Sequence, residues 1–167
     1  MQDQGYIPKD LSFDDEAREK LISGISKISN AVKSTLGPQG QTVLIESAEH
    51  TQGLTVTKDG VTVAKAVFLI DPIENLAVRM MKQASEKTAN TAGDGTTTAI
   101  VLTEALVKAG VEHISGDDNI IQVVRQIRSE GDKLLGRIKD EAVQVNDEML
   151  EDIATISANN DREIGGI

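Results

Sequence analysis

The run from Gly93 to Thr98 reads Gly-Asp-Gly-Thr-Thr-Thr and stands directly before a stretch of helical periodicity. The first turn of a helix presents unpaired backbone N–H groups and the positive end of the helix dipole, so an anion binds there without a basic side chain. Asp94 offers the oxygen ligands that Mg²⁺ prefers, with water and phosphate oxygens as the others. The run therefore indicates a phosphate and metal site. Gly-Asp-Gly is also a common turn, and Asp and Thr are common helix caps, so the motif alone favours neither interpretation.

The composition restricts the classes of function. A chain of 167 residues suits one domain with a core, and with aromatic residues at 2%, aliphatic side chains must fill that core. The formal net charge of -10, with a pI near 4.6, opposes an encounter with nucleic acid or anionic lipid. A nucleotide would therefore have to be bound by backbone N–H groups and a metal ion instead of a basic surface.

Cysteine is absent, which excludes disulfides, thiolate nucleophiles and cysteine-based zinc sites. His50 and His113 stand apart, and we expect both at the surface rather than as metal ligands. The N-terminal residues lack the basic and apolar regions of a secretory signal, and no apolar run is long enough to span a bilayer. We expect a soluble, cytoplasmic protein with no nucleic-acid and no membrane partner.

Apolar spacing predicts a mostly α-helical bundle with a small β-hairpin. Ser12, Asp59 and Asp71 are the expected N-caps of three helices. Gly37 and Pro38 are expected to end the first helix, and Gly110 a later one. Helices are predicted over residues 12–36, 59–67, 72–91, 95–110, 117–138 and 148–156, and strands over residues 42–46 and 54–57.

The expected core follows from the same spacing. The first helix carries an apolar stripe of Ala17, Leu21, Ile25, Ile28 and Val32. The helix that starts at Pro72 is expected to bury Met80 and Met81 as core residues, with a face made of Ile73, Leu76, Met80, Ala84 and Lys87. The last four residues, Ile-Gly-Gly-Ile, carry neither a cap nor a polar tail, which suggests that the chain is part of a longer protein.

Three glycine-containing turns stand at helix boundaries, and none of them is a P-loop. They are Thr35-Leu36-Gly37-Pro38-Gln39-Gly40, Thr57-Lys58-Asp59-Gly60 and the run from Gly93 to Thr98. In this order, joined by helices of these lengths, the turns resemble those of the group I chaperonins, the GroEL family of ATP-driven folding machines. The likeness continues through Glu74-Asn75 and Thr155-Ile156-Ser157-Ala158-Asn159, and it covers the chain from about residue 10 onward.

The resemblance implies a chaperonin equatorial-domain-like helical bundle with a small β-hairpin, ending in the first part of the intermediate domain. Residues 1–11 would form a flexible N-terminus, residues 12–140 the first half of the equatorial ATP-binding domain, and residues 141–167 the start of the intermediate, or hinge, domain. The apical domain and the C-terminal half would be absent. The family's water-activating aspartate lies in that absent part.

The resemblance also assigns roles to residues. Asp94 would bind Mg²⁺, and Asp59 would support catalysis by helping to position the attacking water. The backbone carbonyls of Thr35 and Lys58 would help to hold K⁺, whereas the Lys58 side chain is as readily a solvated surface group. The residues that would contact the nucleotide are Thr35, Leu36, Gly37, Pro38, Lys58, Asp59, Gly60, Asp94, Gly95, Thr96, Thr97, Thr98, Ile156, Ser157 and Asn159.

The chain departs from the family pattern in two places. Gln39 stands where family members usually carry a basic residue, and the hairpin between Glu46 and Leu54 is longer than usual. Both places lie near the family's subunit-contact hairpin, so they bear on how subunits would assemble.

Three functions of different classes follow. The favoured one is a Mg-ATP-dependent chaperonin subunit that forms a ring with identical or related subunits. Unfolded polypeptides and a co-chaperonin would bind only through the missing apical domain. The second is a truncated interaction module that associates with another chaperonin ring and has no ATPase of its own. The third, a free-standing small kinase or hydrolase, lacks a residue that could be named as base or nucleophile.

Overall fold

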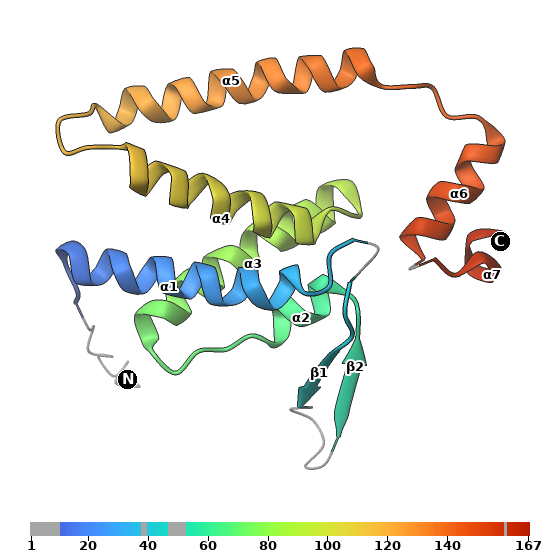
Figure 1. Ribbon diagram of the computed structural model, residues 1–167, viewed down its shortest axis with the longest axis horizontal. Helices are drawn as coiled ribbons and strands as arrows, with labels where there is room; N and C mark the ends of the chain where they lie inside the picture. The colour runs from blue at the N-terminus through green and yellow to red at the C-terminus, as the bar shows by residue number, and fades with distance from the viewer. Residues whose placement is uncertain (1–10, 38–39, 47–52, 159) are drawn as a thin grey trace, which may run out of the picture. The chain divides into compact units, whose positions relative to one another are not determined.

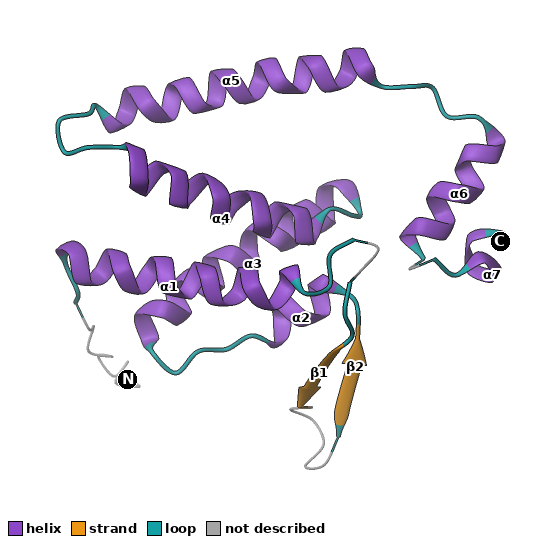
Figure 2. Cartoon of the chain, in the orientation of Figure 1, coloured by secondary structure: helices purple, strands orange, loops and turns teal. Residues whose placement is uncertain are grey.

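The computed structural model describes residues 11–37, 40–46, 53–158 and 160–167. The chain divides into two compact units, one ending at Glu112 and the other starting at His113. Helices make up most of each unit, and the two-stranded sheet belongs to the first (Figures 1 and 2). The predicted fold class, mostly helical with a small hairpin, is confirmed.

The elements follow the predicted order along the chain. The first unit contains α1 (Asp14–Lys33), β1 (Val43–Glu46), β2 (Leu54–Thr57), α2 (Gly60–Ala66), α3 (Pro72–Ala92) and α4 (Thr96–His113), which reaches the boundary between the units. The second contains α5 (Ile120–Glu141), α6 (Asp147–Ser157) and α7 (Arg162–Gly165), a short helix that was not predicted. β1 and β2 pair antiparallel, with Val43 opposite Thr57 and Glu46 opposite Leu54.

Acidic and amide side chains begin most of the helices. Asp59 accepts hydrogen bonds from backbone N–H groups in the first turn of α2, and Asp71 does the same for α3, where Pro72 takes the first helical position. Both caps are as predicted. Asn119, Asn146 and Asp161 begin α5, α6 and α7 in the same way.

Both ends of α1 differ from the prediction. The helix begins after Phe13, with no side-chain cap, so Ser12 is not its cap. It ends at Lys33 rather than Leu36, because the next N–H groups turn back to the carbonyls of Val32 and Lys33 in a tighter turn. Gly37 does have the expected left-handed backbone, whereas Pro38 and Gln39 lie outside the described residues.

Two later boundaries were also predicted wrongly. Gly110 does not end α4, which continues to His113, because an isolated glycine costs a helix only about 1 kcal/mol. α5 begins at Ile120 rather than at Asp117 or Asp118. The reason is that Asp118 accepts hydrogen bonds from the N–H and hydroxyl of Ser115 and so closes the preceding turn, which leaves Asn119 as the cap.

The core of the first unit lies along α1. Its buried hydrophobic cluster consists of Ile28, Val32, Val63, Ala64, Val78, Met81 and Ile100, which come from α1, α2, α3 and α4. Ile28 and Val32 therefore confirm the second half of the predicted stripe. The first half, Ala17, Leu21 and Ile25, is half-buried.

α3 buries a different face from the predicted one. Its buried residues are Asn75, Ala77, Val78, Met81 and Ser85, whereas Leu76 is 54% and Met80 is 63% exposed. Met81 is thus a core residue as expected and Met80 is not. Asn75 can occupy the core because its side-chain carbonyl accepts a hydrogen bond from the Leu69 N–H at 3.1 Å, and a buried polar group is tolerated when it is paired.

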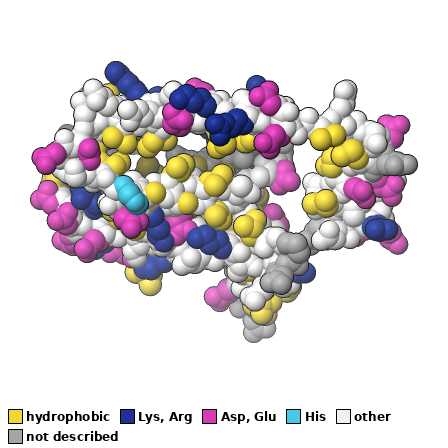
Figure 3. Space-filling view, turned by 45° about the horizontal axis from the view of Figure 1, so that its top comes forward, with side chains coloured by type: hydrophobic (Ala, Val, Ile, Leu, Met, Phe, Trp, Pro, Cys, Tyr) yellow, Lys and Arg dark blue, Asp and Glu magenta, His cyan; other side chains and the backbone are white. Residues whose placement is uncertain are grey.

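In the second unit, α5 has no buried residue. Its exposed apolar side chains are Ile120, Ile121, Val124, Ile127, Leu134, Leu135 and Ile138. α6 and α7 pack against each other. Figure 3 shows hydrophobic side chains open at the surface among acidic and basic ones. Within the described ranges, no helix combines the length and the hydropathy that a membrane span requires.

Candidate functional site

The turn between α3 and α4 is built from two left-handed glycines on either side of Asp94. Gly93 has φ +77° and Gly95 has φ +83°, a region that residues with a Cβ rarely enter. The Gly93 N–H donates to the Ala89 carbonyl at 2.9 Å and ends α3. The Gly95 N–H donates to Asp94 Oδ1 at 2.6 Å. The turn therefore places the exposed Asp94 carboxylate directly before α4.

Within the described residues, no side chain caps the start of α4 as one does on α2, α3, α5, α6 and α7, because Gly95 stands there and has no side chain. The first backbone bond of the helix runs from the Ala99 N–H to the Gly95 carbonyl at 2.9 Å. The N–H groups of Thr96, Thr97 and Thr98 thus have no acceptor within the helix. Binding of an anion by these N–H groups stays a prediction.

The predicted turn that ends at Gly60 contacts the turn between α3 and α4, and Gly60 is the buried first residue of α2. A Cβ added to Gly60 would overlap Thr97 Oγ1, and it would stand 3.2 Å from Val32 Cγ1. Thr97 belongs to the first turn of α4, and Val32 to the last turn of α1, three residues before Thr35. The second and third turns therefore meet beside the last turn of α1, the helix that leads into the first turn (Figure 1).

Both carboxylate oxygens of Asp59 accept hydrogen bonds from the first turn of α2. Oδ1 accepts from the Val61 N–H at 3.2 Å, and Oδ2 accepts from the Thr62 N–H at 2.8 Å and the Thr62 hydroxyl at 2.6 Å. Burial raises the pKa of Asp59, but these hydrogen bonds to Thr62 and Val61 outweigh burial and lower it. A water molecule positioned by Asp59 would have to use the remaining lone pairs.

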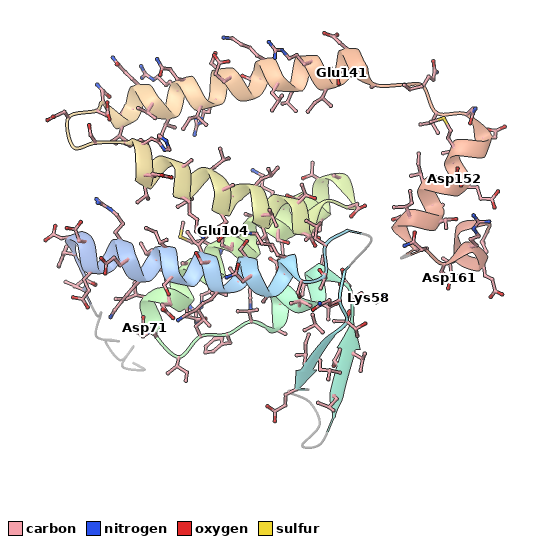
Figure 4. The ribbon with its side chains drawn as sticks, in the orientation of Figure 1. Lys58, Asp71, Glu104, Glu141, Asp152 and Asp161 are labelled. Carbon is pink, nitrogen blue, oxygen red and sulfur yellow. The ribbon has the colours of Figure 1, made fainter. Side chains whose placement is uncertain are left out.

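The first turn is closed by its own hydrogen bonds. The Thr35 hydroxyl donates to the Val32 carbonyl at 2.8 Å, and the Gln41 N–H donates to the Ser34 carbonyl at 2.6 Å. Thr35 is half-buried, while Leu36 and Gly37 are exposed. Lys58, the residue after β2, is exposed as well (Figure 4).

The remaining predicted contacts belong to the second unit. Ile156 and Ser157 are exposed residues at the end of α6. Asn159 lies outside the described residues. Their place beside a nucleotide stays a prediction.

Sequence reasoning missed Glu104, a buried carboxylate in α4 (Figure 4). Its Oε2 accepts a hydrogen bond from Ser29 Oγ at 2.6 Å and pairs with Lys33, and its Oε1 lies 2.7 Å from Lys108 Nζ. Burial raises the pKa of Glu104, but the hydrogen bonds from Lys108, Lys33 and Ser29 outweigh it and lower the pKa to about 2. One signal was present in the sequence: Glu104 follows Ile100 by four residues and so shares its face of the helix.

Comparison with known proteins gives three findings. Residues 28–165 match the sequence model of the TCP-1/cpn60 chaperonin family. The Chaperonin GroEL of Methanospirillum hungatei JF-1 is 42% identical over 160 residues, which are 95% of this chain and 29% of that protein. Solved structures of chaperonins are similar as well.

Chaperonin gp146 from the bacteriophage EL 2 (Pseudomonas aeruginosa), crystallised in the presence of ATP-BeFx, superposes with a TM-score of 0.78 at 31% identity. The match covers 90% of this chain and 26% of that one. A group III chaperonin in the open state has a TM-score of 0.73 at 27% identity, over 91% of this chain and 30% of that one. The chain thus spans less than a third of the length of these relatives.

Proposed function

The chain belongs to the TCP-1/cpn60 chaperonin family, and we propose that it carries the Mg-ATP-binding part of a chaperonin subunit that assists the folding of unfolded polypeptides. One observation supports the nucleotide site most: the turn at Gly60 meets Thr97 beside the last turn of α1, at a helix start that no side chain of the described residues caps. An acidic protein needs such a site, since its net charge of -10 repels a triphosphate.

The residues present fit a magnesium-bound triphosphate. The N–H groups of Thr96, Thr97 and Thr98 would donate to phosphate oxygens at the positive end of α4. Asp94 Oδ1 is held by the Gly95 N–H, and its Oδ2 has no donor in the described part of the chain, so it can serve as a metal ligand. When bound, Mg²⁺ would offset phosphate charge, and water and phosphate oxygens would supply its other ligands.

The finer assignments belong to the same proposal. The first is the group I class, which the 42% identity to a protein named GroEL supports. The others are K⁺ binding by the backbone carbonyls of Thr35 and Lys58, and a water-positioning role for Asp59. A ring of identical or related subunits in the cytoplasm is proposed for the whole protein, as are ATP hydrolysis and contacts with unfolded polypeptides and a co-chaperonin. The intact motif from Gly93 to Thr98 favours this reading over a module without a nucleotide site.

Calorimetric titration of the 167-residue chain with ATP tests the proposal. We expect uptake with Mg²⁺ and little uptake with a chelator. Asp94→Asn keeps an oxygen that can accept from Gly95 but removes the charge, so the affinity for Mg-ATP should fall about tenfold or more, which is about 1.4 kcal/mol.

Asp71→Asn is the matched control, because Asp71 caps α3 and is not among the predicted nucleotide contacts. It should leave the affinity unchanged. Equal affinity of Asp94→Asn and the parent would show that Asp94 is not the metal ligand, and no uptake by the parent would contradict the nucleotide site itself.

A further inference from the structure

α1 carries two Ser-x-x-x-Lys pairs, and each pair holds a glutamate from another helix. Ser23 Oγ and Lys27 Nζ bind Glu74 Oε1, at 2.8 and 2.6 Å, where α3 begins. Ser29 Oγ and Lys33 Nζ bind Glu104 Oε2 in α4. Residues four apart stand on one face of a helix, so each pair reaches a single carboxylate. We call the two groups the Glu74 clamp and the Glu104 clamp.

The two clamps differ in burial. The side chain of Glu104 is 2% exposed, and Lys108, one turn along α4, supplies a second cation beside Lys33. The side chain of Glu74 is 14% exposed, and its partner Lys27 is half exposed. A buried carboxylate must keep its partners, because a charge left unpaired in the interior costs several kcal/mol. The Glu104 clamp therefore allows fewer arrangements of its helices than the Glu74 clamp does.

The two clamps also differ in where they act. Lys33 is the last residue of α1 and precedes Thr35 by two residues, and Glu104 lies about two helical turns after Thr96. The Glu104 clamp thus joins the helix that leads into the first turn to the helix that starts with the uncapped N–H groups. The Glu74 clamp joins the middle of α1 to the start of α3, the end of α3 opposite the turn at Asp94.

We infer that the Glu104 clamp is a positioning element of the proposed nucleotide site, which sets the spacing between the turn at Thr35 and the N–H groups of Thr96–Thr98. The inference rests on the proposed function. Ser29, Lys33 and Glu104 act through these two turns and are positioning residues. The apolar contacts of Ile28, Val32 and Ile100 are non-directional and permit small sliding movements, whereas the two directed bonds from Ser29 and Lys33 to one carboxylate fix the register of α4 on α1.

Glu104→Gln and Glu74→Gln test the inference as a matched pair, since each removes the charge from one clamp and keeps the side-chain size. The absence of cysteine allows two spin labels to be attached at introduced cysteines, at the exposed positions Asn30 in α1 and Leu102 in α4. Both measurements are made well below the unfolding transition, where a loss of stability alone does not change affinity.

We expect Glu104→Gln to broaden the distance distribution between the labels and to weaken Mg-ATP binding about tenfold, as for other groups that orient a binding residue. Glu74→Gln should change neither result. If Glu104→Gln does not fold, Ser29→Ala removes only the hydroxyl hydrogen bond and should give a smaller change in the same direction.

Parent-like label distances and affinity in Glu104→Gln would overturn the inference. So would an equal loss of affinity in Glu74→Gln, which would reveal a general effect of weakened packing. If the parent chain binds no Mg-ATP, the proposed function fails, and the label distances alone then decide whether the clamp positions α4.

Discussion

At Gly60, the absence of a side chain lets α2 begin directly beside α4. An alanine Cβ would overlap Thr97 Oγ1 and stand 3.2 Å from Thr97 Cβ, so rotation of the hydroxyl relieves only part of the clash. We expect Gly60→Ala to lower the free energy of unfolding by about 1–3 kcal/mol, as overpacking usually does. It should also weaken Mg-ATP binding by moving Thr97. Urea unfolding followed by circular dichroism measures the first effect, since the chain has no tryptophan.

Gly131→Ala is the control for this substitution, because a Cβ at Gly131 meets open space inside α5. It should stabilise the helix by about 0.5–1 kcal/mol through the higher helix propensity of alanine. If Gly60→Ala proves as stable as the parent, then α2 and α4 do not approach each other as closely as the structure has them.

Among the elements, those with local signals were predicted well. Asp71-Pro72 begins α3 because the cap and the proline act within one turn, and the β-branched runs form β1 and β2. Gly93 and Gly95 flank Asp94 as expected, because a glycine turn depends on its own backbone. The start of α4, which carries the candidate site, could therefore be predicted from the sequence alone.

Features set by distant partners could not be predicted. Ser29 lies 75 residues from Glu104, so no local pattern relates the hydroxyl to the carboxylate it binds. The buried face of α3 was mistaken because Asn75 and Ser85 occupy positions that hydropathy gives to Leu76 and Met80. Hydropathy ranks a side chain by its own polarity, whereas Asn75 can be buried because the Leu69 N–H supplies a donor for it.

The pairing of α1 with α4 should depend on pH through Glu104. Its pKa falls from 4.5 to about 2 on folding, so between these values the unfolded chain binds more protons than the folded one. The stabilisation is complete above about pH 4.5 and is lost as the pH falls toward about 2. One pKa unit is worth about 1.4 kcal/mol, so the loss is about 3 kcal/mol.

Urea unfolding of the parent and of Glu104→Gln at a series of pH values measures this loss. Asp59, Asp71 and Glu74 also have lowered pKa values and make both proteins sensitive to acid. Only the difference between the two curves is therefore diagnostic, and we expect it to shrink as the pH falls from 4.5 toward 2. Parallel curves would contradict the ionised, paired state of Glu104.

At the scale of the whole molecule, the net charge and the exposed apolar side chains have opposite effects on self-association. The net charge of -10 keeps chains apart at neutral pH, while α5 exposes a row of aliphatic side chains. The helical period of the sequence predicts the helix, but a period cannot tell whether a second surface covers its apolar side chains. The balance between repulsion and apolar contact should therefore decide whether the chain stays monomeric.

We expect the mass measured by size-exclusion chromatography with light scattering to rise with salt, which screens the repulsion, and as the pH approaches 4.6, where the net charge vanishes. Replacing Ile121, Ile127 and Leu134 with glutamine should keep the mass near that of a monomer. The unfolding of the first unit should change little, because α5 has no buried residue. Arg128→Gln with Asp132→Gln, which keeps the net charge and the apolar row, should associate like the parent. Association of the glutamine triple variant to the parent's extent would show that a surface other than α5 drives it.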